Sequence, residues 1–184
     1  MNDQIIIGVA GMPGAGKTTV AEVAKRMHYD VVVMGDEVRE ETKKRKMEPT
    51  PDNVGAVMLE LRQEEGPAVV AHRCIPKIEA RRKRGVVIDG IRSPYETEAF
   101  KQHFPAFIVL ALHSSPETRF KRLFQRNRSD DPASWEVFSA RDWRELQVGL
   151  GNVIALADAM IVNEATRTQL KKQVQVFLGE VASR

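Results

Sequence analysis

A phosphate-binding motif lies near the start of the sequence. The stretch Gly11-Met12-Pro13-Gly14-Ala15-Gly16-Lys17-Thr18 has the pattern G-x-x-x-x-G-K-[ST]. In this pattern, backbone N–H groups of a glycine-rich loop surround phosphates at the positive end of a helix. The lysine reaches the β- and γ-phosphates, and the threonine hydroxyl binds Mg²⁺. We therefore predict that residues 11–18, together with Thr19, bind a nucleoside triphosphate, taken to be ATP, and its magnesium ion.

A carboxylate and two arginines follow later apolar runs. Catalysis of phosphoryl transfer depends mainly on positioning and on cationic stabilisation of the phosphate oxygens. Asp89 directly follows the apolar residues 86–88, as expected for a carboxylate that holds Mg²⁺ together with Thr18. A turn at Asp-Gly would also explain this residue. Arg92 is expected to point into the same cleft, and Arg39 has the corresponding position after the preceding apolar run.

A cluster of arginines predicts a lid over the transferred phosphate. Arg119, Arg122 and Arg126 recur at spacings that place them on one face of a helix. The further members of the cluster are Arg128, Arg141 and Arg144. Planar guanidinium groups suit phosphate oxygens, so we expect a lid at about 119–145 in which arginines 119, 122, 126 and 141 are catalytic. The alternative is a solvated helix face.

The elements that must position these residues follow an alternating pattern. Strands are expected at 5–10, 30–34, 86–88, 106–112 and 160–162, and helices at 19–27, 35–45, 52–65, 68–84, 94–103, 116–127, about 132–143 and 166–178. Strands that alternate with helices predict a three-layer α/β/α fold of the P-loop NTPase type, with a five-stranded parallel sheet. Residues that follow each strand should then face the nucleotide. We expect one domain over 1–184, with an acceptor-binding helical insertion at about 35–84 and the short helical lid.

Composition narrows the functional class. The net charge is +3, and the basic run 81–84 is interpreted as the end of the helix 68–84, where cations complement the helix dipole. Basic residues are not interleaved with aromatic ones, so nucleic-acid binding is not expected. Cys74 is the only cysteine, which excludes an intramolecular disulfide and a cysteine-cluster zinc site. No apolar stretch reaches the roughly 18 residues that span a bilayer, and no signal-peptide pattern precedes the first strand, so we expect a cytoplasmic protein.

Several segments resemble the nucleoside-monophosphate kinases, whose relatives include adenylate kinase and dephospho-coenzyme A kinase. The segment 34–39 looks like the adenylate kinase stretch in which a Gly-Asp pair and an arginine bind the acceptor, which implies this role for Asp36 and Arg39. The segment 88–92 is similar to the Asp-Gly-Phe-Pro-Arg segment of the same family, with one residue fewer before Arg92, and implies that Arg92 also binds the acceptor. The segment 157–163 resembles the dephospho-coenzyme A kinase run that cradles adenine, which implies nucleotide contacts at Asn163.

Over nearly its full length, the chain resembles an archaeal P-loop family related to adenylate kinase. The resemblance rests on Gly-Met-Pro-Gly-Ala-Gly-Lys, Met-Gly-Asp-Glu-Val-Arg-Glu-Glu, Ile-Asp-Gly-Ile-Arg-Ser and Arg-Asp-Trp-Arg-Glu-Leu. It implies the kinase fold and ATP binding, without naming an acceptor. The expected lid is short and lacks the cysteines of zinc-bearing adenylate kinases.

These observations favour an ATP-dependent, Mg²⁺-requiring kinase that phosphorylates a nucleotide-like small acceptor. One alternative is a dephospho-coenzyme A kinase-like activity, suggested by the segment around Asn163. Another is a P-loop ATPase that acts as a switch or regulator without a small-molecule acceptor. A guanine-specific switch is disfavoured because the sequence contains no Asn-Lys-x-Asp motif.

Overall fold

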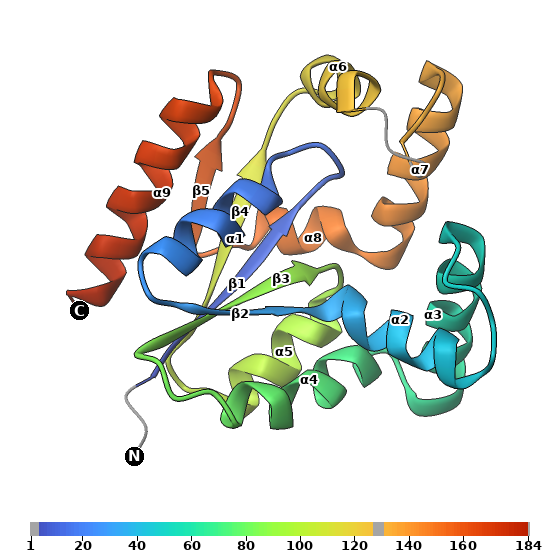
Figure 1. Ribbon diagram of the computed structural model, residues 1–184, viewed down its shortest axis with the longest axis horizontal. Coiled ribbons are helices and arrows are strands. Elements are labelled where there is room, and N and C mark those ends of the chain that lie inside the picture. Colours follow the sequence, from blue (N-terminus) through green and yellow to red (C-terminus); the bar gives the residue numbers. More distant parts are fainter. Residues whose placement is uncertain (1–3, 127–130, 184) are drawn as a thin grey trace.

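A parallel sheet with helices on both faces forms the framework of the protein in its computed structural model (Figure 1), which describes residues 4–126 and 131–183. The strands are β1 (Ile5–Gly11), β2 (Asp30–Val33), β3 (Gly85–Ile91), β4 (Phe107–His113) and β5 (Ala159–Val162). They pair in the order β2-β3-β1-β4-β5, and every pairing is parallel. The predicted three-layer fold with its five-stranded sheet is confirmed.

The helices divide between the two faces of the sheet. They are α1 (Lys17–Arg26), α2 (Met34–Lys44), α3 (Pro51–Glu65), α4 (Val69–Glu79), α5 (Pro94–His103), α6 (Pro116–Arg126), α7 (Trp135–Val148), α8 (Leu150–Ala155) and α9 (Arg167–Ala182). Helices α1 and α9 cover one face, and α4, α5 and α8 cover the other. Strand β1 contributes side chains to the hydrophobic cores on both faces of the sheet, because Ile6 packs on the α5 side and Ile7 on the α1 side. A strand buried on both faces explains its continuous apolar sequence.

Several predicted helix boundaries are wrong, since α7 ends at Val148 rather than 143 and α9 at Ala182 rather than 178. Helix α4 ends at Glu79 rather than residue 84, so the basic run 81–84 lies in the connection to β3 and not in a helical turn. Gly85 must already pair with Ile5 in the sheet, which leaves those residues to bridge the two elements. The helix expected from about residue 132 begins only at Trp135, because its N-cap is Ser134, whose hydroxyl accepts a hydrogen bond from the Val137 N–H.

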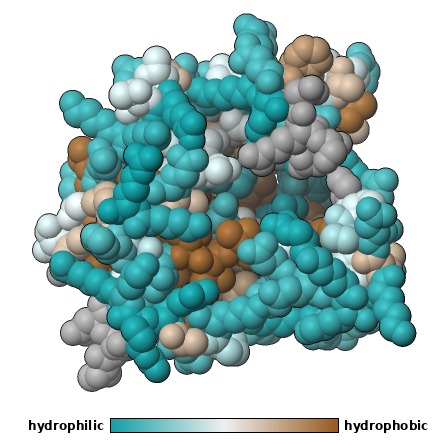
Figure 2. All heavy atoms as spheres, viewed as in Figure 1, coloured by the Kyte–Doolittle hydropathy of each residue, from teal (hydrophilic) through white to brown (hydrophobic). Residues whose placement is uncertain are grey.

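One face of the molecule is hollowed at the carboxyl ends of the strands. The face shown in Figure 2 is mostly hydrophilic and is hollowed beside α7, at the carboxyl ends of the strands. Within the described ranges, no helix combines the length and the apolar character needed to cross a membrane. The predicted lid segment includes residues 127–130, and Arg128 and Asp130 therefore lie outside the described part of the chain.

Candidate active site

A cavity of about 810 Å³ opens at the carboxyl ends of β1 and β3. Its wall combines the glycine-rich loop with residues from β3, α6, α7, the β5–α9 connection and the start of α9. A cavity of this size is in the range that holds a nucleotide-sized ligand. The cavity lies at the edge of the parallel sheet where ligands are expected to bind.

The glycine-rich loop adopts a conformation that needs glycine at two positions. Gly14 and Gly16 have φ values of 83° and 112°, in the left-handed region. A Cβ atom on Gly16 would lie 2.7 Å from the Asn163 Nδ2 atom. That same nitrogen donates a hydrogen bond of 2.9 Å to the Ala15 carbonyl oxygen. The loop is therefore held closely against the β5–α9 connection.

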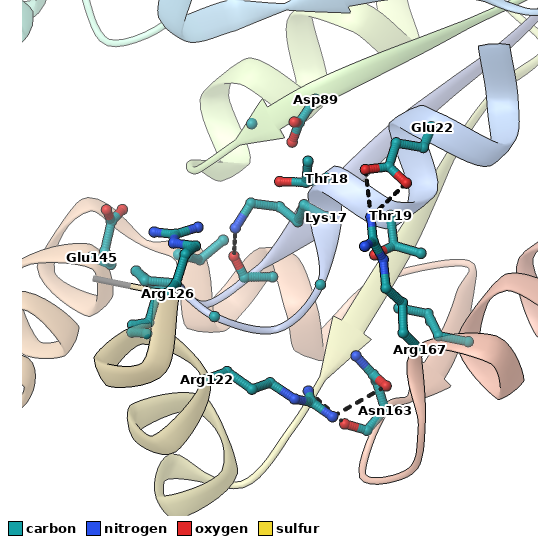
Figure 3. Close-up of a pocket in the computed structure, with 18 of the residues that line it drawn as sticks. Lys17, Thr18, Thr19, Glu22, Asp89, Arg122, Arg126, Glu145, Asn163 and Arg167 are labelled. Atoms are coloured by element: carbon teal, nitrogen blue, oxygen red, sulfur yellow. Dashed lines mark hydrogen bonds and ion pairs between the residues drawn. The ribbon is translucent and has the colours of Figure 1, made fainter. Parts of the chain in front are cut away.

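Lys17 begins α1 and lies at the centre of the cavity (Figure 3). Its Nζ atom donates hydrogen bonds to the carbonyl oxygens of Gly11 and Met12. Burial of the ammonium group lowers the pKa of Lys17 to about 8, opposed by the nearby Asp89 carboxylate and reinforced by Arg92. A phosphate in the cavity would favour the charged form of this lysine.

Asp89 lies at a bulge near the end of β3. Val9 pairs with Asp89 and Ala10 with Ile91, so Gly90 is the extra residue and has a φ of 106°. Asp89 is therefore a strand residue at a bulge rather than part of a turn. Burial raises the pKa of its carboxyl group, while Lys17 lowers it.

The oxygen atoms of Asp89 and Thr18 are suitable ligands for a magnesium ion. The Asp89 Oδ1 atom is buried and has no hydrogen-bond partner among the described residues, and Thr18 lines the same cavity. Mg²⁺ is typically held by one or two carboxylates together with water and substrate phosphates. No group of three or more His, Cys, Asp or Glu residues is arranged as a metal cluster within 4–126 and 131–183. One carboxylate and one hydroxyl are therefore available to hold Mg²⁺ together with substrate phosphates.

One end of the cavity is formed around Asn163. Arg122 donates hydrogen bonds to the Asn163 carbonyl oxygen at 2.9 Å and to the Ser114 hydroxyl at 3.0 Å. At the same end, Arg167 pairs with Glu22 of α1 at 2.6 Å (Figure 3). The predicted residues Arg122 and Asn163 are therefore neighbours at the cavity wall.

Arg119 has a different environment from the other predicted lid arginines. Its side chain is 4% exposed and makes a two-pronged contact with the Asp142 carboxylate at 2.9 and 2.5 Å. It also donates to the Pro13 carbonyl oxygen at 3.2 Å and lies over the Phe138 ring. Arg119 is not among the described residues that line the cavity; it links α6 and α7 to the glycine-rich loop.

The other end of the cavity carries charges from β3, α6 and α7. Arg92, Arg126 and Arg141 all line it, in agreement with their predicted location. Arg92 donates to the Glu145 Oε1 atom at 3.1 Å. Arg126 donates to the Asp131 Oδ2 atom at 2.9 Å.

Asp36 and Arg39 form an ion pair of 2.8 Å in the first turns of α2. Neither is among the described residues that line this cavity.

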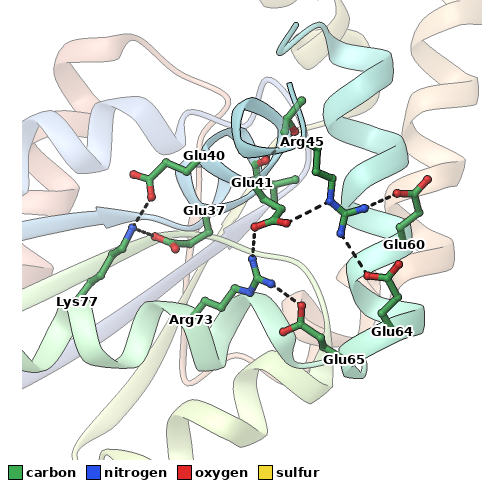
Figure 4. Close-up of polar contacts among 11 residues, drawn as sticks. Glu37, Glu40, Glu41, Arg45, Glu60, Glu64, Glu65, Arg73 and Lys77 are labelled. Carbon is green, nitrogen blue, oxygen red and sulfur yellow. Dashed lines mark hydrogen bonds and ion pairs between the residues drawn. The ribbon is translucent and has the colours of Figure 1, made fainter. Parts of the chain in front are cut away.

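Helix α2 is joined to α3 and α4 by a network of ion pairs (Figure 4). In it, Glu41 accepts from Arg73 at 2.9 Å and from Arg45 at 3.2 Å. The other contacts join Arg45 to Glu60 and Glu64, Arg73 to Glu65, and Lys77 to Glu37 and Glu40.

Four polar cavity residues were not predicted from the sequence: Glu22, Gln125, Glu145 and Arg167. Arg167 had a detectable signal, because it directly follows Thr166, which caps α9 and lies close to the predicted Asn163 segment. Glu145 belongs to the Arg-Asp-Trp-Arg-Glu-Leu segment that carries the family resemblance, but no spacing predicted its place in the cavity, which it reaches only through the packing of α7 beside the loop.

Comparison with known proteins identifies the family of this chain. A family model described as an AAA domain matches residues 10–139. The UPF0200 protein MJ1399 of Methanocaldococcus jannaschii is 47% identical over 179 residues, covering 96% of this chain and 90% of that protein. A UPF0200 protein of Thermococcus sibiricus is 48% identical, covering 93% of this chain and 92% of its own length. The chain belongs to the UPF0200 family. This confirms the resemblance to an archaeal P-loop family.

Solved structures share the fold of this UPF0200 protein at low sequence identity. TT1252 from Thermus thermophilus aligns with a TM-score of 0.65 and 19% identity, covering 96% of this chain and 97% of that one. A gluconokinase from Sinorhizobium meliloti aligns at 0.61 and 17% identity, covering 99% and 95%. The shikimate kinase from Acinetobacter baumannii aligns at 0.59 and 18% identity, covering 97% and 96%. The chain therefore shares the overall fold of these three proteins.

Proposed function

We propose that this UPF0200 protein is an ATP-dependent, Mg²⁺-requiring phosphotransferase that moves the γ-phosphate of ATP to a small, nucleotide-like acceptor. The observation that carries the proposal is the convergence of Lys17, the unpartnered Asp89 carboxylate oxygen and several arginines on one cavity beside the glycine-rich loop. Neighbours in structure named gluconokinase and shikimate kinase support small-molecule phosphorylation as the reaction class.

The residues divide into donor and acceptor groups. Lys17 and the loop amides bind the β- and γ-phosphates, and the end of the cavity around Asn163 receives the nucleoside. Thr18 and Asp89 would hold Mg²⁺, which supplies positive charge to the phosphate oxygens when bound. Arg126 and Arg141 stabilise negative charge on the transferred group, and Arg122, which contacts Asn163, is assigned to the nucleotide.

Two further roles follow from the positions of the remaining predicted residues. Arg92, at the cavity wall, is assigned to the acceptor, and the resemblance of segment 34–39 to adenylate kinase assigns Asp36 and Arg39 to it as well. Arg119 acts through the loop that it holds, because its guanidinium group contacts Asp142 and the Pro13 carbonyl oxygen.

The test is acceptor-dependent product formation. Purified protein is incubated with ATP, Mg²⁺ and single candidates from a panel of nucleoside monophosphates, dephospho-coenzyme A, gluconate and shikimate, and products are separated by chromatography. We expect ADP and a phosphorylated acceptor with at least one candidate, and neither with Lys17→Ala. ATP hydrolysis that ignores every acceptor but rises with a protein partner would instead support the ATPase switch.

Product analysis with dephospho-coenzyme A as the single acceptor tests the nearest alternative within the kinase class, a dephospho-coenzyme A kinase-like activity. This candidate is retained because Asn163 lies at the cavity wall, where the resemblance to dephospho-coenzyme A kinase places adenine contacts.

A further inference from the structure

Two buried carboxylate oxygens in the cavity have no hydrogen-bond partner among the described residues. One is Asp89 Oδ1, already assigned to magnesium, and the other is Glu145 Oε2. The Glu145 side chain is 12% exposed, and its Oε1 atom accepts a hydrogen bond from Arg92. A buried acceptor without a donor is costly, so Glu145 Oε2 marks a place where a ligand group is expected.

Glu145 lies on the acceptor side of Lys17. Figure 3 shows Lys17 between the Glu22–Arg167 pair on one side and Glu145 on the other, with the lysine side chain extended toward the Glu145 side. The carboxylate is also close enough to affect the pKa of Lys17. Because Asn163 and Arg167 lie with the nucleoside end, Glu145 is placed beyond the γ-phosphate position.

The chemistry of an unpartnered carboxylate oxygen discriminates between acceptor groups. It requires a hydrogen-bond donor, and it repels anions in a partly buried setting. An ionised phosphate offers mainly acceptor oxygens and negative charge. A hydroxyl offers a proton and no charge, and thus satisfies Glu145 Oε2.

We propose that the acceptor group of this enzyme is a hydroxyl and that Glu145 is its general base, an inference that rests on the proposed phosphotransferase activity. The acceptor hydroxyl donates its proton to Glu145 Oε2 while its oxygen forms a bond to the γ-phosphorus. The bond from that phosphorus to the β–γ bridging oxygen breaks, and its electron pair leaves with ADP. The products are a phosphate monoester, ADP and a proton that passes from Glu145 to solvent.

Arg92 is the positioning residue in this arrangement. Its hydrogen bond to Oε1 orients the carboxylate and leaves Oε2 for the acceptor. The contact joins the end of β3 to α7, so the base comes into position when both elements meet at the cavity.

The first experiment replaces Glu145 with the isosteric amide. In Glu145→Gln the side-chain carbonyl still accepts from Arg92, but the base is lost, so we expect kcat to fall about 100-fold or more with the dissociation constant for ATP changed less than about threefold. The rate is measured with the panel compound that is turned over fastest and, separately, as ATP hydrolysis with water as the acceptor. Glu136→Gln is the matched control, because Glu136 is an exposed residue of the same helix.

A purely structural role predicts a different pattern. If Glu145 only anchors Arg92, the glutamine variant retains that contact and keeps kcat within a few-fold of the original. This result would overturn the assignment of Glu145 as base.

The second experiment identifies the bond that is formed. Products from hydroxyl acceptors without a terminal phosphate (adenosine, glycerol, dephospho-coenzyme A) and from phosphate acceptors (AMP, CMP) are examined by ³¹P NMR. We expect phosphate monoesters from the first group. A phosphoanhydride formed on AMP or CMP would overturn the hydroxyl assignment while the phosphotransferase proposal stands. Absence of any acceptor-dependent product would overturn both.

Discussion

At the scale of single residues, the cavity places charged groups where water is scarce. Burial lowers the pKa of Lys17 to about 8 and raises that of Asp89. Each group partly compensates the other, because their charges are opposite. The triphosphate and its cation would complete this compensation, so the protonation of the empty site differs from that of the loaded one.

The depressed pKa of Lys17 predicts that nucleotide affinity depends on pH. Below about pH 8 the lysine is already an ammonium ion, and binding needs no proton. Above that value the neutral form dominates, and the bound phosphates restore the charge by proton uptake. We therefore expect the affinity for ATP to fall about tenfold per pH unit above the lysine pKa. Calorimetry in buffers of different ionisation enthalpy measures the proton uptake directly.

Lys17→Ala is the control for this pH dependence. It should bind ATP weakly with little uptake of protons at any pH in this range. Equal proton uptake by the variant would assign the titration to another group.

A second residue-scale prediction concerns Asp89→Asn. The amide keeps the shape of the side chain but removes the charge of the unpartnered oxygen. We expect the gain in ATP affinity that Mg²⁺ confers to fall about 10- to 100-fold, with metal-free ATP binding no weaker than in the original protein. Titration of ATP with and without Mg²⁺ measures both quantities. An unchanged Mg²⁺ effect would exclude Asp89 from the metal site.

At the scale of elements, α6 and α7 are attached to the glycine-rich loop by one buried cation. Arg119 contacts Asp142 through two hydrogen bonds and the Pro13 carbonyl oxygen through a third. Removal of one member of such a pair leaves a buried charge without compensation. The positions of α6 and α7 and the shape of the loop are therefore coupled.

This coupling predicts a non-additive double-mutant cycle. Arg119→Met and Asp142→Leu should each lower the free energy of unfolding by about 3 kcal/mol, and the double variant should lose clearly less than the sum. Urea unfolding measures the three differences. Additive losses would show that the two side chains do not interact energetically.

The ion-pair network of α2, α3 and α4 is centred on Glu41, and its stabilising effect should depend on pH. Hydrogen bonds from Arg73 and then Arg45 lower the pKa of Glu41 below its usual 4.5. Stability from this ionised group is present above the unfolded pKa and is lost as the pH falls through the folded one. We expect Glu41→Gln to cost about 1 kcal/mol at neutral pH, with a smaller difference in acid or in high salt.

Urea unfolding at neutral and acidic pH compares Glu41→Gln with Glu48→Gln, a substitution at an exposed site. A loss of stability in Glu41→Gln that stays constant into acid would contradict an electrostatic origin.

Sequence patterns predicted the elements whose signals are local. The glycine-rich loop, the apolar strand 5–10 and the start of the last helix at Thr166 depend on neighbouring residues and agree with the structure. Helix α8 and the end of α4 did not follow from periodicity, because packing and strand pairing determine them.

The site residues likewise divide into those with a local sequence signal and those that long-range packing brings to the cavity. Lys17 and Arg92 follow strands, Asp89 lies near the end of one, and all three were predicted at the cavity. Glu145 instead lies on a helix 53 positions beyond Arg92. The burial of Arg119 depends on Asp142, 23 residues further along the chain. Contacts between distant segments leave no spacing pattern in one sequence.

At the scale of the whole molecule, the cavity draws on segments from both ends of the chain. The loop after β1, the end of β3, helices α6 and α7 and the start of α9 all contribute residues to it. A nucleotide bound there contacts elements from both faces of the sheet. It should therefore stabilise the protein as one cooperative unit.

This argument predicts a single, nucleotide-dependent shift of the thermal transition. With Mg²⁺ and a non-hydrolysable ATP analogue at about 100 times its dissociation constant, the free energy of unfolding should rise by about 2.7 kcal/mol. For a chain of this size that corresponds to about 5 to 11 °C in Tm. Calorimetry should show one transition that moves as a whole, and Lys17→Ala should reduce the shift sharply at the same analogue concentration. If α2–α4 melted in a separate transition that the nucleotide left in place, the insertion would be energetically independent of the site, and its proposed role in acceptor binding would lose its thermodynamic basis.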